Sequence, residues 1–185
     1  MKIYIFIASS FLVLTTKKLY SQQHFEENEV FYTIVLDIKT NNQIFINCNK
    51  PKTYFNVKDF IKETSLKDIP VTVLSELNQN TKENLYKKEK WSDNYLLNFR
   101  KLPIINKLSY EKCLNINEIK KIQDTLNRRN LILTISKPIF DEAKEHCIVN
   151  VVTSNYRGYF SAYSCFLKKV YGKWVIIERF GEIIS

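Results

Sequence analysis

The C-terminal third of the chain has a residue pattern that leaves little choice of local fold. Residues 145–154 and 159–170 are rich in β-branched and aromatic residues, and they are separated by a short polar stretch that contains a glycine. A tight turn around Gly172 then leads into a third segment of the same kind, residues 174–180. Alternation with a period of two between turn residues is typical of β-strands. We therefore predict an antiparallel β-meander over this part of the chain.

Helices are predicted mainly in the first two thirds of the chain. Residues 27–38 carry apolar side chains at helical spacing, although their β-branched content leaves a strand open. Asn115 and Glu118 form a capping box in front of a further helical pattern. Two more helices are predicted, one beginning at Pro70 with Val71, Val73, Leu74 and Leu77 as its buried stripe and one over residues 91–99.

Strands are also predicted at residues 43–47 and 131–136. Because apolar residues fall on both faces of the meander, each face needs a cover. We expect helices on one face and loops or a partner on the other. The predicted fold class is α+β, with N-terminal and central helices packed on a C-terminal antiparallel β-meander.

The first 21 residues differ from the rest of the chain. Lys2 is followed by an apolar run over residues 3–14, which is shorter than the roughly 20 residues that a membrane-spanning helix needs. Such a run behind a positive residue is typical of a secretory signal peptide, and Ser21 is a small residue at a cleavage position. We predict a signal peptide over residues 1–21 and a single α+β domain over residues 22–185.

After cleavage we expect a protein exported to the periplasm or the extracellular space, with no membrane-spanning segment in the mature chain. Two alternatives stay open. Lys17 and Lys18 lie close to the predicted cleavage position, which leaves a retained membrane anchor open as the first alternative. The apolar run is also compatible with a buried N-terminal element of a cytosolic protein.

The charge of the chain bears on its partners. It carries 28 Lys and Arg residues against 19 Asp and Glu residues, a net charge of +9. The lysines are interspersed with acidic residues, and neither an arginine-rich arm nor a basic motif interleaved with aromatic residues is found. This pattern disfavours nucleic acid. The partner is unknown from the sequence, and a protein or a component of the cell envelope fits an excess of positive charge.

Four cysteines, at positions 48, 113, 147 and 165, follow the predicted signal peptide. Export and an even number favour disulfide bonds, for which four cysteines allow three connectivities. Structural zinc sites usually contain a close pair such as C-x-x-C, which the sequence lacks. We therefore predict no metal site and no cofactor.

One disulfide pairing follows from strand geometry. If Ser154 faces Gly158 in the predicted hairpin, then Cys147 lies directly opposite Cys165. Facing Cβ atoms are ~4.5–5.5 Å apart, close to the ~3.5–4.5 Å of a disulfide, whereas a slip of one residue would place the sulfur atoms on opposite faces. We predict the Cys147–Cys165 bond, and free buried cysteines are the equal alternative.

A series of short motifs lies in the C-terminal part of the chain. They are Ser136-Lys-Pro138-Ile-Phe140, Cys147-Ile-Val-Asn-Val-Val152, Phe166-Leu-Lys-Lys169 and Gly172-Lys-Trp174. This series resembles the uncharacterised short exported proteins of Bacteroidota with a C-terminal Ser-x-Pro-x-Phe / Gly-x-Trp β-meander, closely over residues 131–185 and more loosely over residues 27–47. The chain departs from them at residues 154–158, where those proteins often have a glycine-rich stretch. The resemblance implies export and architecture, and it implies no activity.

No catalytic motif stands out. His146 and Glu145 are neighbours in a predicted strand, so their side chains point to opposite faces, and a surface histidine is the favoured interpretation. The serines lack a G-x-S-x-G context, and the 3 glycines form no phosphate-binding loop. Paired carboxylates of the glycosidase kind stay open, because their separation in space is not visible in a sequence. We predict no catalytic residue.

Aromatic side chains gather around the turns of the predicted meander. Tyr156, Arg157, Tyr159 and Tyr163 are the members we expect on a binding surface, because aromatic residues and arginine near loops are typical of such surfaces. Core packing is the plainer interpretation of the same residues. We predict an exported, non-enzymatic binding or interaction domain. The alternatives are a hydrolase-like enzyme whose site is assembled from distant residues, and a structural component of the envelope.

Overall fold

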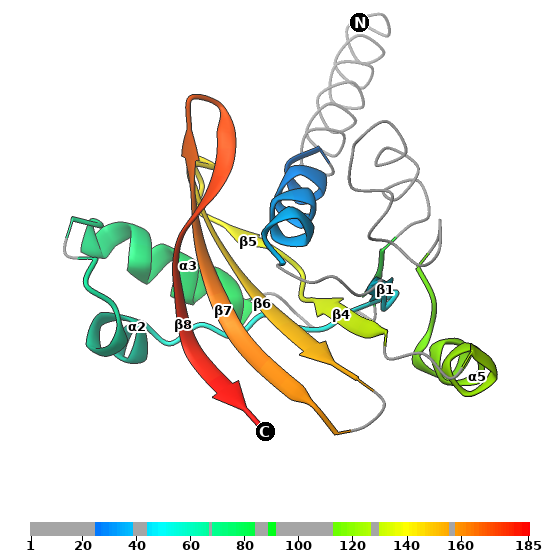
Figure 1. Ribbon diagram of the computed structural model, residues 1–185. Coiled ribbons are helices and arrows are strands. Elements are labelled where there is room, and N and C mark those ends of the chain that lie inside the picture. The colour runs from blue at the N-terminus through cyan, green and yellow to red at the C-terminus, as the bar shows by residue number, and fades with distance from the viewer. Residues whose placement is uncertain are drawn as a thin grey trace, which may run out of the picture.

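The computed structural model describes residues 25–38, 44–66, 68–83, 89–91, 113–126, 130–155 and 158–185. The predicted signal peptide lies outside these residues, as does the predicted helix over residues 91–99 except for Trp91. The described part is an α+β fold in which helices pack on a curved sheet (Figure 1).

The predicted meander is confirmed, and it forms one side of the sheet, with β8 at the edge. Its strands are β6 (His146–Ser154), β7 (Phe160–Val170) and β8 (Lys173–Ile184). The other strands are β1 (Ile44–Ile46), β2 (Asn49–Lys50), β3 (Glu89–Lys90), β4 (Leu131–Ile135) and β5 (Ile139–Phe140). The sheet has the order β1-β4-β6-β7-β8, with β5 also pairing with β6, and only β1 and β4 are parallel among these pairs. Strands β2 and β3 form a separate antiparallel pair.

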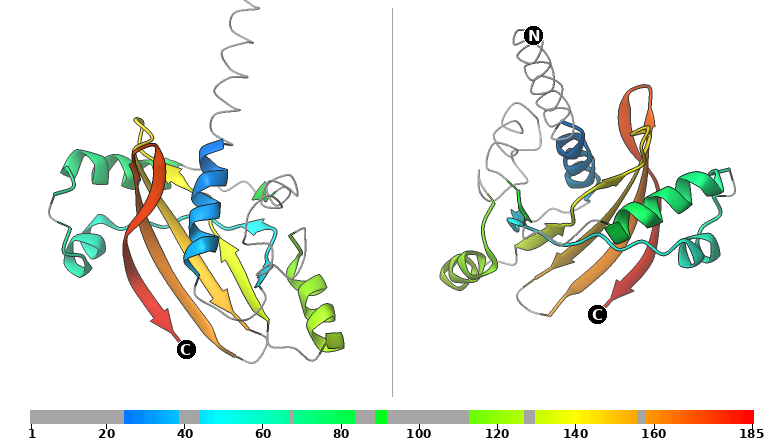
Figure 2. Two further views of the ribbon diagram at one scale, coloured as in Figure 1. Left: turned by 45° about the horizontal axis from the view of Figure 1, so that its top comes forward. Right: turned by 180° about the vertical axis from the view of Figure 1, so that it is seen from behind.

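Helices cover both faces of the sheet, whereas the sequence analysis expected helices on one face only (Figure 2). Residues 25–37 are helical and pack on one face against β6 and β7. Helices α2 (Val57–Glu63) and α3 (Val71–Glu83) pack on the other face. Helix α5 (Ile116–Leu126) packs with β1 and β4 through Ile119. These two helical layers explain why the strands carry apolar residues on both faces.

The starts of helices α5 and α3 were both predicted from local sequence motifs. The capping box of α5 is confirmed: the Asn115 side chain accepts hydrogen bonds from Asn117 N and Glu118 N at 3.0 Å, and Asn115 N donates to Glu118 Oε2 at 2.8 Å. Helix α3 begins at Val71, and Pro70 precedes it and accepts the first hydrogen bonds through its carbonyl. The predicted buried stripe of α3 is only half right. Leu74 and Leu77 are buried, whereas Val71 is 67% exposed.

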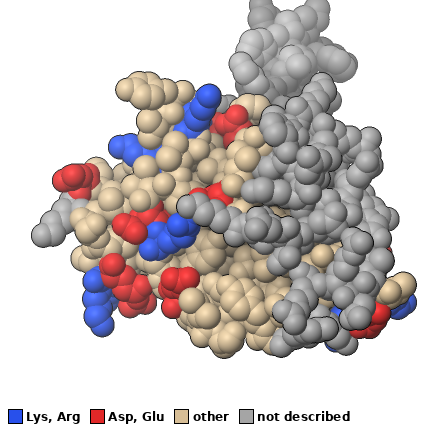
Figure 3. Space-filling view, in the orientation of Figure 1, with Lys and Arg blue, Asp and Glu red and all other residues tan. Residues whose placement is uncertain are grey.

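Charged side chains of both signs are mixed on the face of the molecule shown in Figure 3. Lysine and arginine atoms lie next to aspartate and glutamate atoms across the described part of that face, and neither sign gathers into a broad patch there. The excess of positive charge in the sequence is therefore not concentrated on this described face.

The predicted Cys147–Cys165 bond is wrong in the structure, because the β6–β7 register differs from the expected one by two residues. Ser154 pairs with Phe160, so Cys147 faces Leu167 and Cys165 faces Val149. Both cysteines are buried free thiols on the same face of the sheet. The cause is a wider turn, in which Asn155 N donates to Tyr159 O at 3.0 Å and the Asn155 side chain accepts from Tyr159 N at 3.1 Å.

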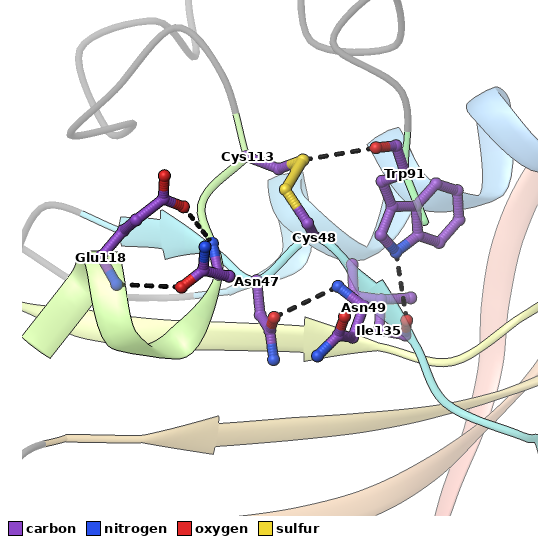
Figure 4. The surroundings of a disulfide bond; sticks show 8 residues. Asn47, Cys48, Asn49, Trp91, Cys113, Glu118 and Ile135 are labelled. Carbon is purple, nitrogen blue, oxygen red and sulfur yellow. Dashed lines mark hydrogen bonds between the residues drawn. A yellow bond between two sulfur atoms is a disulfide. The ribbon is translucent and has the colours of Figure 1, made fainter. Parts of the chain in front are cut away.

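The disulfide bond joins Cys48 to Cys113, which are 65 residues apart in the sequence (Figure 4). Cys48 follows β1 and Cys113 precedes α5. Cys48 N donates to Leu114 O at 3.0 Å, and Trp91 N donates to Cys48 O at 2.8 Å, so the bond lies between two segments that already pair through their backbones. It therefore ties α5 and residues 89–91 to the β1 side of the sheet.

Candidate functional site

A buried carboxylate near the start of the helical residues 25–37 anchors this segment to the meander. Glu26 is 5% exposed and forms an ion pair with Lys169 Nζ at 2.7 Å. Its second oxygen accepts a hydrogen bond from Trp174 Nε1 at 2.7 Å. The Lys169 ammonium also lies 5.0 Å from the centroid of the Trp174 ring. These contacts connect the helical segment to β7 and to the start of β8.

A second buried ion pair lies beside the first. Glu27 pairs with Lys50 Nζ at 2.8 Å, and the two side chains are 4% and 3% exposed. Lys50 Nζ lies 4.2 Å from the centroid of the Trp91 ring. A buried ion pair is stable only in good geometry, and breaking one is costly. The two pairs therefore define how residues 25–37 sit on the sheet, and with that the space beside them.

Two hollows lie beside residues 25–38, and Asp37 lines both. The first, of about 640 Å³, is called the helix–β8 hollow and is lined by Glu29, Tyr32, Thr33, Leu36, Asp37, Lys173, Trp174, Val175 and Ile176. The second, of about 530 Å³, is called the tyrosine pocket and is lined by Asp37, Ile38, Leu131, Thr153, Asn155, Tyr159, Ser161, Tyr163, Arg179 and Glu182. The lining of the tyrosine pocket combines hydroxyl groups, aromatic rings and charged side chains.

Strand alternation builds the base of the tyrosine pocket. Ser161 and Tyr163 are alternate residues at the start of β7, so their side chains share one face, and Tyr159 directly precedes the strand. Thr153 of β6 is the register partner of Ser161. Thr153 is 7% and Ser161 4% exposed, and both line the pocket. No hydrogen bond from the described residues engages either hydroxyl group, and neither oxygen is fully enclosed, so both hydroxyl groups open into the pocket.

The rim of the pocket carries a charge pair that joins the helical segment to β8. The Arg179 guanidinium forms an ion pair with the Asp37 carboxylate, and this hydrogen bond raises the pKa of Arg179. The guanidinium carbon also lies 6.0 Å from the centroid of the Tyr163 ring, a distance at which a cation is attracted to an aromatic face. Arg179 is thus held by both an acid and a ring.

Burial keeps the phenol of Tyr163 and the thiol of Cys165 neutral. Desolvation raises the pKa of the Tyr163 hydroxyl. Desolvation also raises the pKa of Cys165, the β7 residue that faces Arg179, to about 12. At neutral pH the phenol and the thiol therefore keep their protons.

The structure brings together half of the binding surface expected from the sequence. Tyr159 and Tyr163 both line the tyrosine pocket, whereas Tyr156 and Arg157 lie outside the described residues. The hydroxyl groups of Thr153 and Ser161 were missed. Their signal was available, because they are polar residues on an otherwise apolar face of two neighbouring strands. Asp37 and Arg179 are 142 residues apart, and no local pattern connects them.

His146 has a different carboxylate partner from Glu142 and Glu145, the two glutamates considered for it in the sequence. Its Nδ1 lies 2.8 Å from Asp141 Oδ2, and its side chain is 12% exposed rather than on the surface. The other Asp141 oxygen accepts hydrogen bonds from the backbone N–H groups of Glu145 and His146 at 2.8 and 3.0 Å. The Asp141 carboxylate therefore closes the turn between β5 and β6, and this pair has a structural explanation.

Among the described residues, no group of three or more His, Cys, Asp or Glu side chains is arranged to hold a metal ion. The described helices include none with the length and apolar character needed to cross a bilayer. No family model, curated protein or solved structure matches this chain.

Proposed function

We propose that the protein is a binding protein that works outside the cytoplasm and takes a small ligand into the tyrosine pocket. One observation carries the proposal: the hydroxyl groups of Thr153 and Ser161 open into the pocket, and no group of the described residues hydrogen-bonds to them. A hydroxyl group can both donate and accept hydrogen bonds, so these two are available to whatever enters the pocket. A polar ligand would take up both of them.

The Cys48–Cys113 bond supports the location. Disulfides persist in oxidising compartments such as the periplasm and the extracellular space, and they are rare in the cytosol. The predicted signal peptide over residues 1–21 and the resemblance to short exported proteins of Bacteroidota point the same way. These three features together support the proposal that the protein is exported.

The protonation states around Arg179 favour binding over covalent catalysis. A cysteine or tyrosine nucleophile reacts as its anion, and burial raises the pKa of both Cys165 and Tyr163. Arg179 is already engaged by Asp37. Groups that are fixed in one charge state and held by neighbours are suited to orienting a ligand.

Filling the pocket tests the proposal. Ser161→Leu places an apolar side chain on the pocket floor, and Ser154→Leu is the matched control, because Ser154 lies at the same end of the sheet but alternates with Thr153 to the other face. We expect native mass spectrometry of the protein purified from an extracytoplasmic fraction to show a bound small molecule in the wild type and in Ser154→Leu. Ser161→Leu should lose it.

The same pair of variants gives a thermal readout. A ligand at 100 times its Kd adds about 2.7 kcal/mol to the free energy of unfolding, so a small-molecule extract should raise the Tm of the wild type and of the control but not that of Ser161→Leu. A wild-type protein that carries no ligand and whose Tm does not respond to the extract would contradict the proposed function. Equal responses of all three proteins would place the site elsewhere.

A further inference from the structure

We infer that the ligand of the tyrosine pocket is a neutral, polyhydroxylated molecule of the saccharide class. The inference rests on the proposed function and names the ligand of the same site. Its starting point is the pocket floor, where the register partners Thr153 and Ser161 present two adjacent hydroxyl groups. A hydroxyl group both donates and accepts hydrogen bonds, and so do the hydroxyl groups of a sugar ring.

The charges at the rim argue against an ionic ligand. Arg179 is the one cationic residue among the described lining residues, and the Asp37 carboxylate neutralises it. Glu182 adds a further carboxylate to the rim. An anion would therefore meet no surplus of positive charge, and a cation would compete with Arg179 for the face of Tyr163. A neutral ligand avoids both costs.

The same rim groups suit neutral hydroxyl groups well. A carboxylate accepts hydrogen bonds, and the planar guanidinium donates several in a fixed fork. Asp37, Glu182 and Arg179 can therefore bind ligand hydroxyl groups in addition to, rather than instead of, their own pairing. Hydrogen-bond donors and acceptors therefore line both the floor and the rim of the pocket.

Two tyrosine rings supply the apolar part of the site. Tyr159 is 44% exposed and lines the pocket together with Tyr163. An aromatic ring offers a flat apolar surface with a polar end, which matches the C–H face and the hydroxyl edge of a sugar ring. The volume of about 530 Å³ lies within the range of ~300–1,000 Å³ that is common for small-molecule sites.

The test uses neutral sugars as probes on the purified, processed protein. Glucose, galactose, mannose and N-acetylglucosamine, with their β-1,4-linked disaccharides and tetrasaccharides, are titrated by calorimetry and by NMR chemical shifts. We expect at least one of them to bind. A preference for single sugars would identify a free saccharide as the ligand, and a preference for the tetrasaccharide would identify a glycan chain. Glucuronate, which adds a carboxylate to the glucose frame, should bind more weakly than glucose.

Three variants locate the binding. Thr153→Val keeps the side-chain shape and removes one floor hydroxyl, which should raise Kd roughly fivefold. Tyr159→Ala removes a ring from the pocket and should raise Kd about tenfold. Tyr171→Ala is the matched control, because Tyr171 is fully exposed at the tip of the β7–β8 hairpin, and it should leave Kd unchanged. The Tm of Thr153→Val should not fall, since its hydroxyl has no partner to lose.

The outcomes separate the two proposals. If no neutral sugar binds while the wild type still carries a small molecule that Ser161→Leu loses, the saccharide inference is wrong and the binding function stands. Sugar binding that Thr153→Val and Tyr159→Ala leave unchanged also overturns the inference. If neither sugars nor any endogenous small molecule bind, both proposals fail.

Discussion

Replacing Cys48 and Cys113 together with alanine is expected to lower the free energy of unfolding by about 4 kcal/mol. The bond joins residues 65 positions apart, and a cross-link that closes a loop of this length removes much of the conformational freedom of the unfolded chain, about 4 kcal/mol in the chain-entropy description. Urea unfolding followed by tryptophan fluorescence measures the change, with the slope of the transition used to detect a changed unfolded state.

Reductant provides the internal control for this prediction. A reducing agent should destabilise the wild type by the same amount and leave the Cys48→Ala/Cys113→Ala variant unaffected. The Cys147→Ala/Cys165→Ala variant should keep the full response to reductant, because those two cysteines are free. Loss of the response in that variant, with its retention in Cys48→Ala/Cys113→Ala, would show that the wrong cysteines had been paired.

Glu26→Ala is expected to lower the free energy of unfolding by about 3 kcal/mol. The substitution removes the acceptor of the Trp174 Nε1 hydrogen bond and the partner of the Lys169 ammonium. Trp174 is 5% exposed, so its N–H group would lose its bond to Glu26 without regaining full contact with water. Glu26→Gln, which keeps one acceptor oxygen, should lose roughly half as much. Thermal and urea unfolding measure both variants.

Glu29→Gln is the matched control on the same helical segment. Burial and the nearby charge of Glu26 raise the pKa of Glu29, so the fold disfavours its ionised form. The contribution of Glu29 to stability therefore decreases as the pH rises through its raised pKa. At pH 7 Glu29→Gln should leave the free energy of unfolding unchanged or slightly higher. If Glu26→Ala costs no more than Glu29→Gln, then Glu26 does not anchor the helical segment.

Local patterns were enough to predict much of the fold. The period-two alternation predicted β6, β7 and β8, and the side chains of Asn115 and Glu118 predicted the start of α5. Each of these features depends on residues close together in the sequence. The two-residue error in the β6–β7 register came from the turn, where the Asn155–Tyr159 hydrogen bonds make the connection wider than the sequence suggested.

Features that join distant residues were beyond local rules. The parallel pairing of β1 with β4 and the Cys48–Cys113 bond depend on segments brought together by the whole fold. The same is true of the pocket. Tyr159 and Tyr163 were predicted together because they lie close together in the sequence, whereas the Asp37–Arg179 pair joins the helical segment to β8 and needs a three-dimensional structure.

An extracytoplasmic binding protein must first be exported and lose its signal peptide. The most direct measurement is the intact mass of the protein recovered from the cell, alkylated at pH 8 without reductant, both native and in denaturant. We predict a chain that lacks residues 1–21 and carries two alkylated cysteines in denaturant and none in the native state, where Cys147 and Cys165 are buried and the pKa of Cys165 is raised to about 12. An unprocessed chain in the cytosol with four alkylated cysteines in denaturant would contradict the account.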